Sequence, residues 1–142
     1  MTVKQLSVFI ENREGRLGEV LSVLRKRGVN ILSMSLADTT EYGLLRLIVN
    51  NPEKGREALI AEGFSSTVTE VFVIKVPHKA GALQEILEYI AKKNVNIEYM
   101  YGLSIDGADA TVVMKTNDLE SAKAVIAENG IATMSEEEVH AK

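Results

Sequence analysis

The chain of 142 residues has no cysteine and no tryptophan, and it has only two prolines and two histidines. Without cysteine it has neither disulfide bonds nor a thiol nucleophile. Around His78 and His140 no nucleophile–histidine–acid arrangement can be identified, and the acidic residues and histidines lack metal-ligand spacing. Glycine occurs once per turn, not in a phosphate-binding run. We therefore expect no enzymatic activity, no metal and no cofactor.

Basic charge, aromatic side chains and long apolar runs are also scarce. The 16 basic residues are outnumbered by 20 acidic ones, so the net charge is −4, and aromatic residues make up 5%. Nucleic acids need a clustered basic face or stacking platforms, so we expect no nucleic-acid partner. No apolar run reaches the roughly 18–20 residues that span a bilayer, and the N-terminus does not have a signal-peptide pattern. These features predict a cytoplasmic protein with no membrane partner.

What the sequence does contain is a repeat with an offset of 66 residues. The matching pairs are Gly15 and Gly81, Leu17 and Leu83, Leu24 and Ile90, Val29-Asn30-Ile31 and Val95-Asn96-Ile97, Met34 and Met100, Asn51 and Asn117, and positions within 58–62 and 124–128. A period this long exceeds that of solenoid repeats and indicates a duplicated small domain. We predict two domains, residues 1–70 and 71–142. Each has a small core, so we expect them to pack together and against a second chain.

The first half has the hydrophobic pattern of two helices and four strands. Alternation predicts a strand over 3–10, and apolar residues at helical spacing predict a helix over 17–24. Further strands are expected over 29–36, 44–49 and 66–71. Asn51-Pro52-Glu53 is a typical helix start, and Gly28 and Gly63 are expected to end the two helices.

The second half is expected to repeat this order. Strands are predicted over 71–76, 95–105, 110–115 and 131–136, with a turn at Asp106-Gly107 and a solvated strand end or tail at 136–138. Asn117 is the predicted cap of the last helix and Gly130 its end. No flexible linker separates the halves, so strand 66–71 should run directly into strand 71–76. The order βαββαβ, twice, predicts an α+β protein of two ferredoxin-like sandwiches, with antiparallel sheets and helices on one face.

The segment IENREGRLGEVLSVLRKRGVNILSMSL, residues 10–36, resembles the ACT domain, a small amino-acid-sensing module. The matching features are the turn at 12–15, the apolar helix stripe and the Asn30-Ile31 pair that opens the next strand. Both halves carry them in the same order, so the resemblance covers nearly the whole chain. It is close to the regulatory domain of phosphoglycerate dehydrogenase and to the regulatory subunit of acetohydroxyacid synthase.

The resemblance implies ligand-binding residues at the strand-to-helix turn and at the start of the next strand. In this chain they are Asn12, Arg13, Gly15, Arg16, Leu17, Asn30 and Ile31 in the first half, and His78, Gly81, Leu83, Asn96 and Ile97 in the second. Glycine lets the backbone approach a ligand, and free N–H groups at a helix start favour a carboxylate. Two departures weaken the pattern: Glu14 and Ala80 stand where many members have proline, and His78 replaces Asn12.

The implied function is a stand-alone allosteric regulator. It would bind a small amino acid where two ACT domains pack together, form a homodimer, and act in trans on a partner such as a biosynthetic enzyme. The alternative is an assembly module that dimerises without a ligand, and a small enzyme or nucleic-acid binder is a third possibility. Purely structural roles stay open for the turn glycines and for Asn30 and Asn96, which can bond the local backbone.

Overall fold

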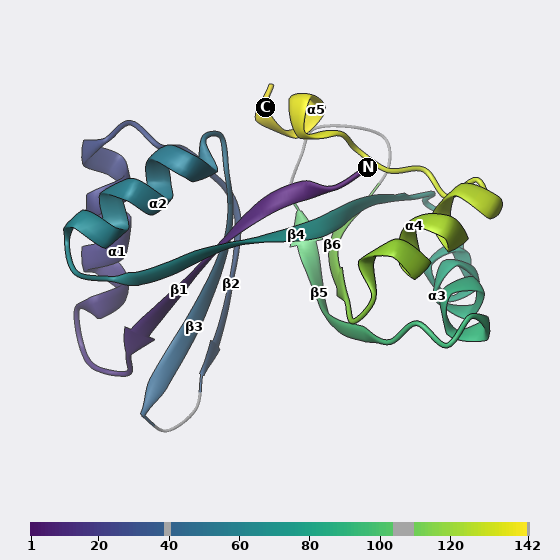
Figure 1. Ribbon diagram of the computed structural model, residues 1–142, viewed down its shortest axis with the longest axis horizontal. Coiled ribbons are helices and arrows are strands. Elements are labelled where there is room, and N and C mark those ends of the chain that lie inside the picture. Colours follow the sequence, from purple (N-terminus) through teal and green to yellow (C-terminus); the bar gives the residue numbers. More distant parts are fainter. Residues whose placement is uncertain (39–40, 104–109, 142) are drawn as a thin grey trace. The chain divides into compact units, whose positions relative to one another are not determined.

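The computed structural model describes residues 1–38, 41–103 and 110–141. The elements are β1 (Val3–Glu11), α1 (Arg16–Lys26), β2 (Ile31–Asp38), β3 (Tyr42–Val49), α2 (Pro52–Ala61), β4 (Ser65–Val76), α3 (Ala82–Lys92), β5 (Ile97–Leu103), β6 (Ala110–Thr116), α4 (Leu119–Glu128) and α5 (Glu136–His140) (Figure 1). They form two units. The N-terminal unit comprises Lys4–Thr69 with Val139–Lys142, and the C-terminal unit comprises Glu70–Glu138 with Met1–Val3.

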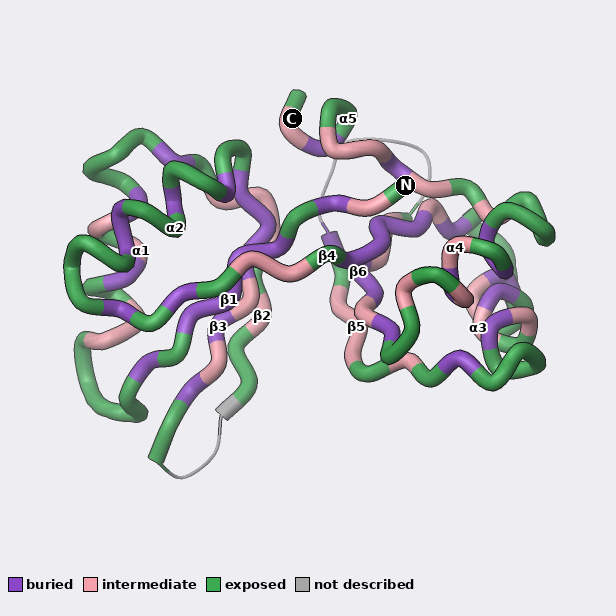
Figure 2. The backbone as a smooth tube through the Cα atoms, in the orientation of Figure 1, coloured by how far each residue is buried: buried purple, intermediate pink, exposed green. Residues whose placement is uncertain are grey.

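The N-terminal unit is a βαββαβ sandwich whose strands lie in the order β2-β3-β1-β4. Val8 on β1 and Leu36 on β2 both pair with Leu45 on the central strand β3, so these three side chains share one face. Helices α1 and α2 cover that face (Figure 1), and buried residues recur along the strands beneath them (Figure 2). The core consists of Leu6, Val8, Ile10, Val20, Leu24, Val29, Leu45, Leu47, Val49, Leu59 and Phe64.

The C-terminal unit repeats this plan with the strand order β4-β6-β5. Helices α3 and α4 bury their apolar stripes against the sheet, around Phe72, Ile74, Ile86, Ile90, Met114, Val125 and Ile126. β4 is continuous from Ser65 to Val76, which confirms the prediction that two strands run together without a linker. The predicted α+β fold is therefore confirmed. The turn predicted at 106–107 lies outside the described residues.

The strand predicted over 131–136 is wrong. Only an isolated bridge between Ile74 and Thr133 forms there, and helix α5 follows. The reason is local: the Ser135 hydroxyl accepts a hydrogen bond from the Glu138 N–H (3.2 Å), and the Glu138 carboxylate accepts one from the Ser135 N–H (3.2 Å). This reciprocal pair is a capping box, which starts a helix. The acidic run at 136–138 is thus a first helical turn and not a strand end.

A shared C-terminal motif ends α1, α2, α3 and α4. At each end one residue with positive φ follows the cap, namely Gly28 (69°), Gly63 (85°), Asn94 (58°) and Gly130 (60°). After α1, for example, the Gly28 N–H donates to the Arg25 carbonyl and the Val29 N–H to the Leu24 carbonyl. These are the two hydrogen bonds of a Schellman motif. The predicted roles of Gly28, Gly63 and Gly130 are confirmed.

The structural offset of the repeat is 66 before the β-hairpins and 67 after them. α1 and α3 start at Arg16 and Ala82, whereas α2 and α4 start at Pro52 and Leu119. Asn51 caps α2 as predicted, accepting a hydrogen bond from the Lys54 N–H. The cap of α4, however, is Asp118. The prediction that Asn117 caps this helix is therefore wrong, and so is the pairing of residues 58–62 with 124–128.

Candidate ligand site

The strand-to-helix turns of both units end in a glycine with left-handed backbone. Gly15 has φ 84° and Gly81 has φ 82°, and each is the N-cap of the next helix without a side-chain hydrogen bond to the helix. A Cβ built on either glycine would meet no atom within 4 Å. The backbone at the start of α1 and α3 is thus open to an approaching group, as the sequence predicts for a carboxylate site.

The second helix of each unit begins differently. The Asn51 carboxamide oxygen accepts from the Lys54 N–H at 3.2 Å, and the Asp118 carboxylate accepts from the Ser121 N–H at 3.1 Å. Two hydrogen bonds from Ser121 lower the pKa of the Asp118 carboxyl: the one from its hydroxyl has the larger effect, and the one from its N–H has the smaller. α2 and α4 therefore have a side chain that caps the first turn, whereas in the described part of the chain no side chain caps α1 or α3.

Two backbone hydrogen bonds and an ion pair hold the turn before α1 in shape. The Asn12 N–H donates to the Glu41 carbonyl (2.9 Å), the Arg13 N–H donates to the Glu11 carbonyl (2.9 Å), and the Arg13 guanidinium pairs with the Glu11 carboxylate (2.8 Å). These residues are exposed. In the corresponding turn of the C-terminal unit, His78 is also exposed. Both turns therefore present polar groups to solvent beside an uncapped helix.

Asn30 and Asn96 lie immediately before β2 and β5, and each is held by hydrogen bonds to another asparagine. The Asn30 N–H donates to the Asn50 side chain (2.9 Å), and the Asn50 N–H donates back to the Asn30 carbonyl (3.1 Å). Asn96 and Asn117 make the same exchange at 2.9 and 3.0 Å. The local bonding of Asn30 and Asn96 thus uses their backbone groups. Both residues are exposed, so their side chains remain accessible.

Within the N-terminal unit, Asn12 and Asn30 lie at opposite ends of α1. This helix has 11 residues and is therefore about 16 Å long. Asn12 bonds near the β2–β3 turn, whereas Asn30 bonds Asn50 at the other end of the sheet. Asn12 and Asn30 of the same N-terminal unit are therefore too far apart to contact one small molecule.

Asn30 and Ile31 line a hollow of about 400 Å³ where α1 meets β2. The other lining residues are Leu21, Arg25, Gly28 and Val29. The hollow combines an amide, a guanidinium and an apolar wall. An arginine and an asparagine at one edge suit a carboxylate and its neighbouring polar groups.

Three of the predicted ligand residues also contact other parts of the protein. Leu17 and Leu83 are half-buried and pack on the cores of their units. The Arg16 guanidinium stacks on Phe64, 4.5 Å from the ring centroid, and pairs with Glu19 at 2.5 Å. Phe64 follows α2 and is distant in sequence, so no local pattern reveals this contact. Gly81, Asn96 and Ile97 occupy places equivalent to Gly15, Asn30 and Ile31.

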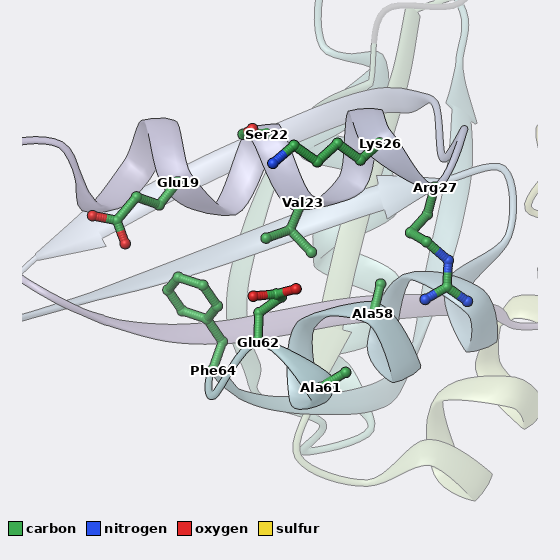
Figure 3. Close-up of a pocket in the computed structure, with 9 residues that line it drawn as sticks. All are labelled: Glu19, Ser22, Val23, Lys26, Arg27, Ala58, Ala61, Glu62 and Phe64. Carbon is green, nitrogen blue, oxygen red and sulfur yellow. The ribbon is translucent and has the colours of Figure 1, made fainter.

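A second cavity, of about 310 Å³, lies between α1 and α2 and was not predicted. Its lining residues are Glu19, Ser22, Val23, Lys26, Arg27, Ala58, Ala61, Glu62 and Phe64 (Figure 3). In Figure 3 the Glu62 carboxylate lies beside Val23 in the space between the helices. The lining has both signs of charge, and among the described residues none of the predicted ligand residues belongs to it. In the sequence, the only sign of this cavity is the set of polar residues on α1 and α2 that face each other.

The edge strand β2 exposes apolar side chains beside the first hollow. Met34 is 41% and Leu36 48% exposed, although they pair with the buried core residues Leu47 and Leu45 and so point to the helix-covered face. Among the described residues, β2 is an edge strand that bonds to β3 alone within its sheet. An edge with open backbone groups and apolar side chains is a surface on which another strand can pair.

Comparisons with known proteins assign the class. The whole chain, residues 1–142, matches the family described as "ACT domain pair", and the protein belongs to this family. Protein BT0572 from Bacteroides thetaiotaomicron is 34% identical, with a TM-score of 0.92, and the match covers 99% of this chain and 96% of that one. The ligand-free regulatory subunit of aspartate kinase from Thermus thermophilus has the same fold at 17% identity and TM-score 0.61, covering 88% and 91%.

Among curated proteins no sequence matches this chain. Over the described ranges 1–38, 41–103 and 110–141, no three His, Asp or Glu side chains gather as metal ligands. No helix in those ranges is both long and apolar enough to cross a membrane.

Proposed function

We propose that this protein is a stand-alone regulator that binds a small amino acid and acts on a partner in trans. It has no catalytic role of its own, and the partner is a biosynthetic enzyme. One observation carries the proposal: α1 begins at an open, uncapped turn, whereas α2 caps itself through Asn51. The family supports the same conclusion, because ACT domains are regulatory modules.

The ligand site is completed by a second copy of the chain. Asn12 and Asn30 are separated by the length of α1, so a ligand that contacts both must take them from different units. Antiparallel pairing of two β2 strands would cover Met34 and Leu36 and add a second α1 beside the first. The uncapped turn of one copy then faces the Asn30 hollow of its partner. The turn N–H groups take the carboxylate, and Asn12 and Asn30 take the amino group.

Such a site couples the ligand to an output by simple thermodynamics. A ligand that touches two copies binds one arrangement of the pair more tightly than others and so shifts the population towards it. A partner enzyme that prefers the same arrangement is regulated by the same coupling free energy. The C-terminal site has His78 in place of Asn12, so the side chain it offers a ligand differs from that of the N-terminal site.

The test is a thermal-shift screen of the purified protein against the twenty amino acids, followed by calorimetry on any that bind. A ligand that binds the folded state stabilises it, by about 2.7 kcal/mol at a hundred times its Kd, and so raises the melting temperature. Asn12→Ala and Asn30→Ala should each abolish the shift. Glu14→Ala is the matched control, because this exposed turn residue makes no proposed ligand contact.

The assembly module is the second candidate, favoured by the exposed apolar residues on β2. It predicts a dimer that no amino acid stabilises. If none of the twenty shifts the melting temperature and the protein is still dimeric by analytical ultracentrifugation, the amino-acid sensor is rejected and the assembly module is retained.

A further inference from the structure

The hollow where α1 meets β2 is lined by charge of one sign. The described residues that line it are Leu21, Arg25, Gly28, Val29, Asn30 and Ile31, and Arg25 is the one ionisable residue in this set. Arg25 is exposed, and among the residues that the structure describes its guanidinium makes no ion pair. The hollow therefore offers a positive charge that no carboxylate of its own lining offsets.

The two basic residues that follow Arg25 lie elsewhere. Lys26 and Arg27 line the cavity between α1 and α2 (Figure 3) and are not among the residues that line this hollow. All three stand at the C-terminal end of α1, where the helix dipole favours any cation. The dipole accounts for basic residues at this helix end in general, whereas Arg25 also supplies hydrogen-bond donors to the hollow.

The repeat shows that the fold does not need this arginine. Helices α1 and α3 begin at Arg16 and Ala82, so the offset of 66 places Ala91 at the position of Arg25. α3 nevertheless ends, as α1 does, with a residue of positive φ after its cap. Most other lining positions are the same in both units, namely Leu21 and Leu87, and Val29-Asn30-Ile31 and Val95-Asn96-Ile97. Arg25 is therefore a feature of the N-terminal hollow and not of the helix end.

The chemistry of the lining suits an alkyl chain that ends in a carboxylate. A guanidinium presents two parallel N–H donors that match the two oxygens of a carboxylate. Leu21, Val29 and Ile31 give the hollow an apolar wall against which methylene groups can pack. Its volume of about 400 Å³ is within the range of about 300–1,000 Å³ that is typical of small-molecule pockets.

We propose that the amino acid bound by this protein has an acidic side chain, that of aspartate or glutamate. The inference rests on the function proposed above, in which the turn of one copy takes the α-carboxylate and Asn30 of the other copy helps to take the amino group. Arg25, which lines the same hollow as Asn30, then donates to the side-chain carboxylate. The C-terminal unit, with Ala91 at this position, has no such preference.

The test compares each acid with its amide, aspartate with asparagine and glutamate with glutamine, because the members of a pair have nearly the same shape and differ in charge. Calorimetry on the full chain should show one of the acids binding about tenfold more tightly than its amide, as expected for a hydrogen bond between charged groups. In Arg25→Gln this ratio should fall to about one. Arg25→Lys keeps the charge without the planar fork and should keep part of the preference.

Lys26→Gln is the matched control, because it removes the neighbouring positive charge from outside the hollow and should leave the ratio nearly unchanged. An acid that binds no more tightly than its amide would overturn the acidic class and leave an amino-acid regulator in place. A ratio that Arg25→Gln does not lower, even if both affinities fall, would also overturn it, because Arg25 would then hold the α-carboxylate or nothing. If none of the twenty amino acids binds, the regulator itself is rejected, and this inference with it.

Discussion

At the scale of single residues, the turn glycines are required by backbone geometry and not by packing. Gly15 has φ 84°, yet a Cβ there would contact nothing within 4 Å. Gly18, in the first turns of α1, also has open space but an ordinary helical φ. Substitutions at these two glycines, one at the cap of α1 and one inside it, therefore distinguish the effect of backbone conformation from the effect of side-chain size.

Gly15→Ala should lower the free energy of unfolding by about 1 kcal/mol, because an L-residue in the left-handed region is strained. Gly18→Ala should raise it by about 0.5 kcal/mol, because alanine favours the helix. Urea denaturation followed by circular dichroism measures both. Equal effects of the two substitutions would show that φ at Gly15 does not decide the turn.

At the residue scale, the sequence predicts where the turns lie but not which distant side chains contact each other. The glycine before each helix and the Asn-Ile pair are local patterns, so their positions could be predicted from the sequence. The stacking of Arg16 on Phe64 joins residues far apart in the chain, and only the packing of α1 against the end of α2 creates it.

At the scale of elements, the predictions failed where short capping motifs start a helix. Asn117 and Asp118 are both good N-caps, and the sequence does not say which one starts α4; in the structure Asn117 instead holds the Asn96 backbone. After Thr133 the Ser135 and Glu138 capping box forms a helix in place of the expected strand. Long apolar stripes and alternating strands, by contrast, were placed correctly because their period alone determines them.

The α5 capping box should be visible in a pH titration. The Ser135 N–H, followed by Lys75, lowers the pKa of Glu138 below 4.5, so its contribution to stability is present above pH 4.5 and is lost as the pH falls through the lowered value. Ser135→Ala removes the hydroxyl that accepts from the Glu138 N–H, so α5 should fray and the pKa should rise towards 4.5. Carbon-detected NMR of the carboxyl group measures it.

The matched control for this titration is Ser135→Thr, which keeps a hydroxyl at the cap and should keep the pKa of Glu138 low. An unchanged pKa in Ser135→Ala would show that the Ser135 N–H and Lys75 keep it low without the hydroxyl, and that the complete capping box is not needed.

At the scale of the whole molecule, the repeat has kept its fold and altered its sites. Both units have the same uncapped first helix, asparagine clamp and helix ends. They differ at the positions of Asn12 and His78 and of Arg16 and Ala82. Duplication followed by such changes has left two units of the same fold with different side chains at the turn and at the start of the first helix.

The proposed function requires that an amino acid binds between two copies of the chain, with Asn12 from one and Asn30 from the other. The decisive measurement is calorimetry on a mixture of the Asn12→Ala and Asn30→Ala proteins after subunit exchange, using the amino acid found in the screen. Each variant alone should not bind. In a symmetric dimer, random mixing should restore about a quarter of the wild-type sites, because each mixed pair contains one intact site. No recovery on mixing, with exchange confirmed by mass spectrometry, would contradict a site shared between copies.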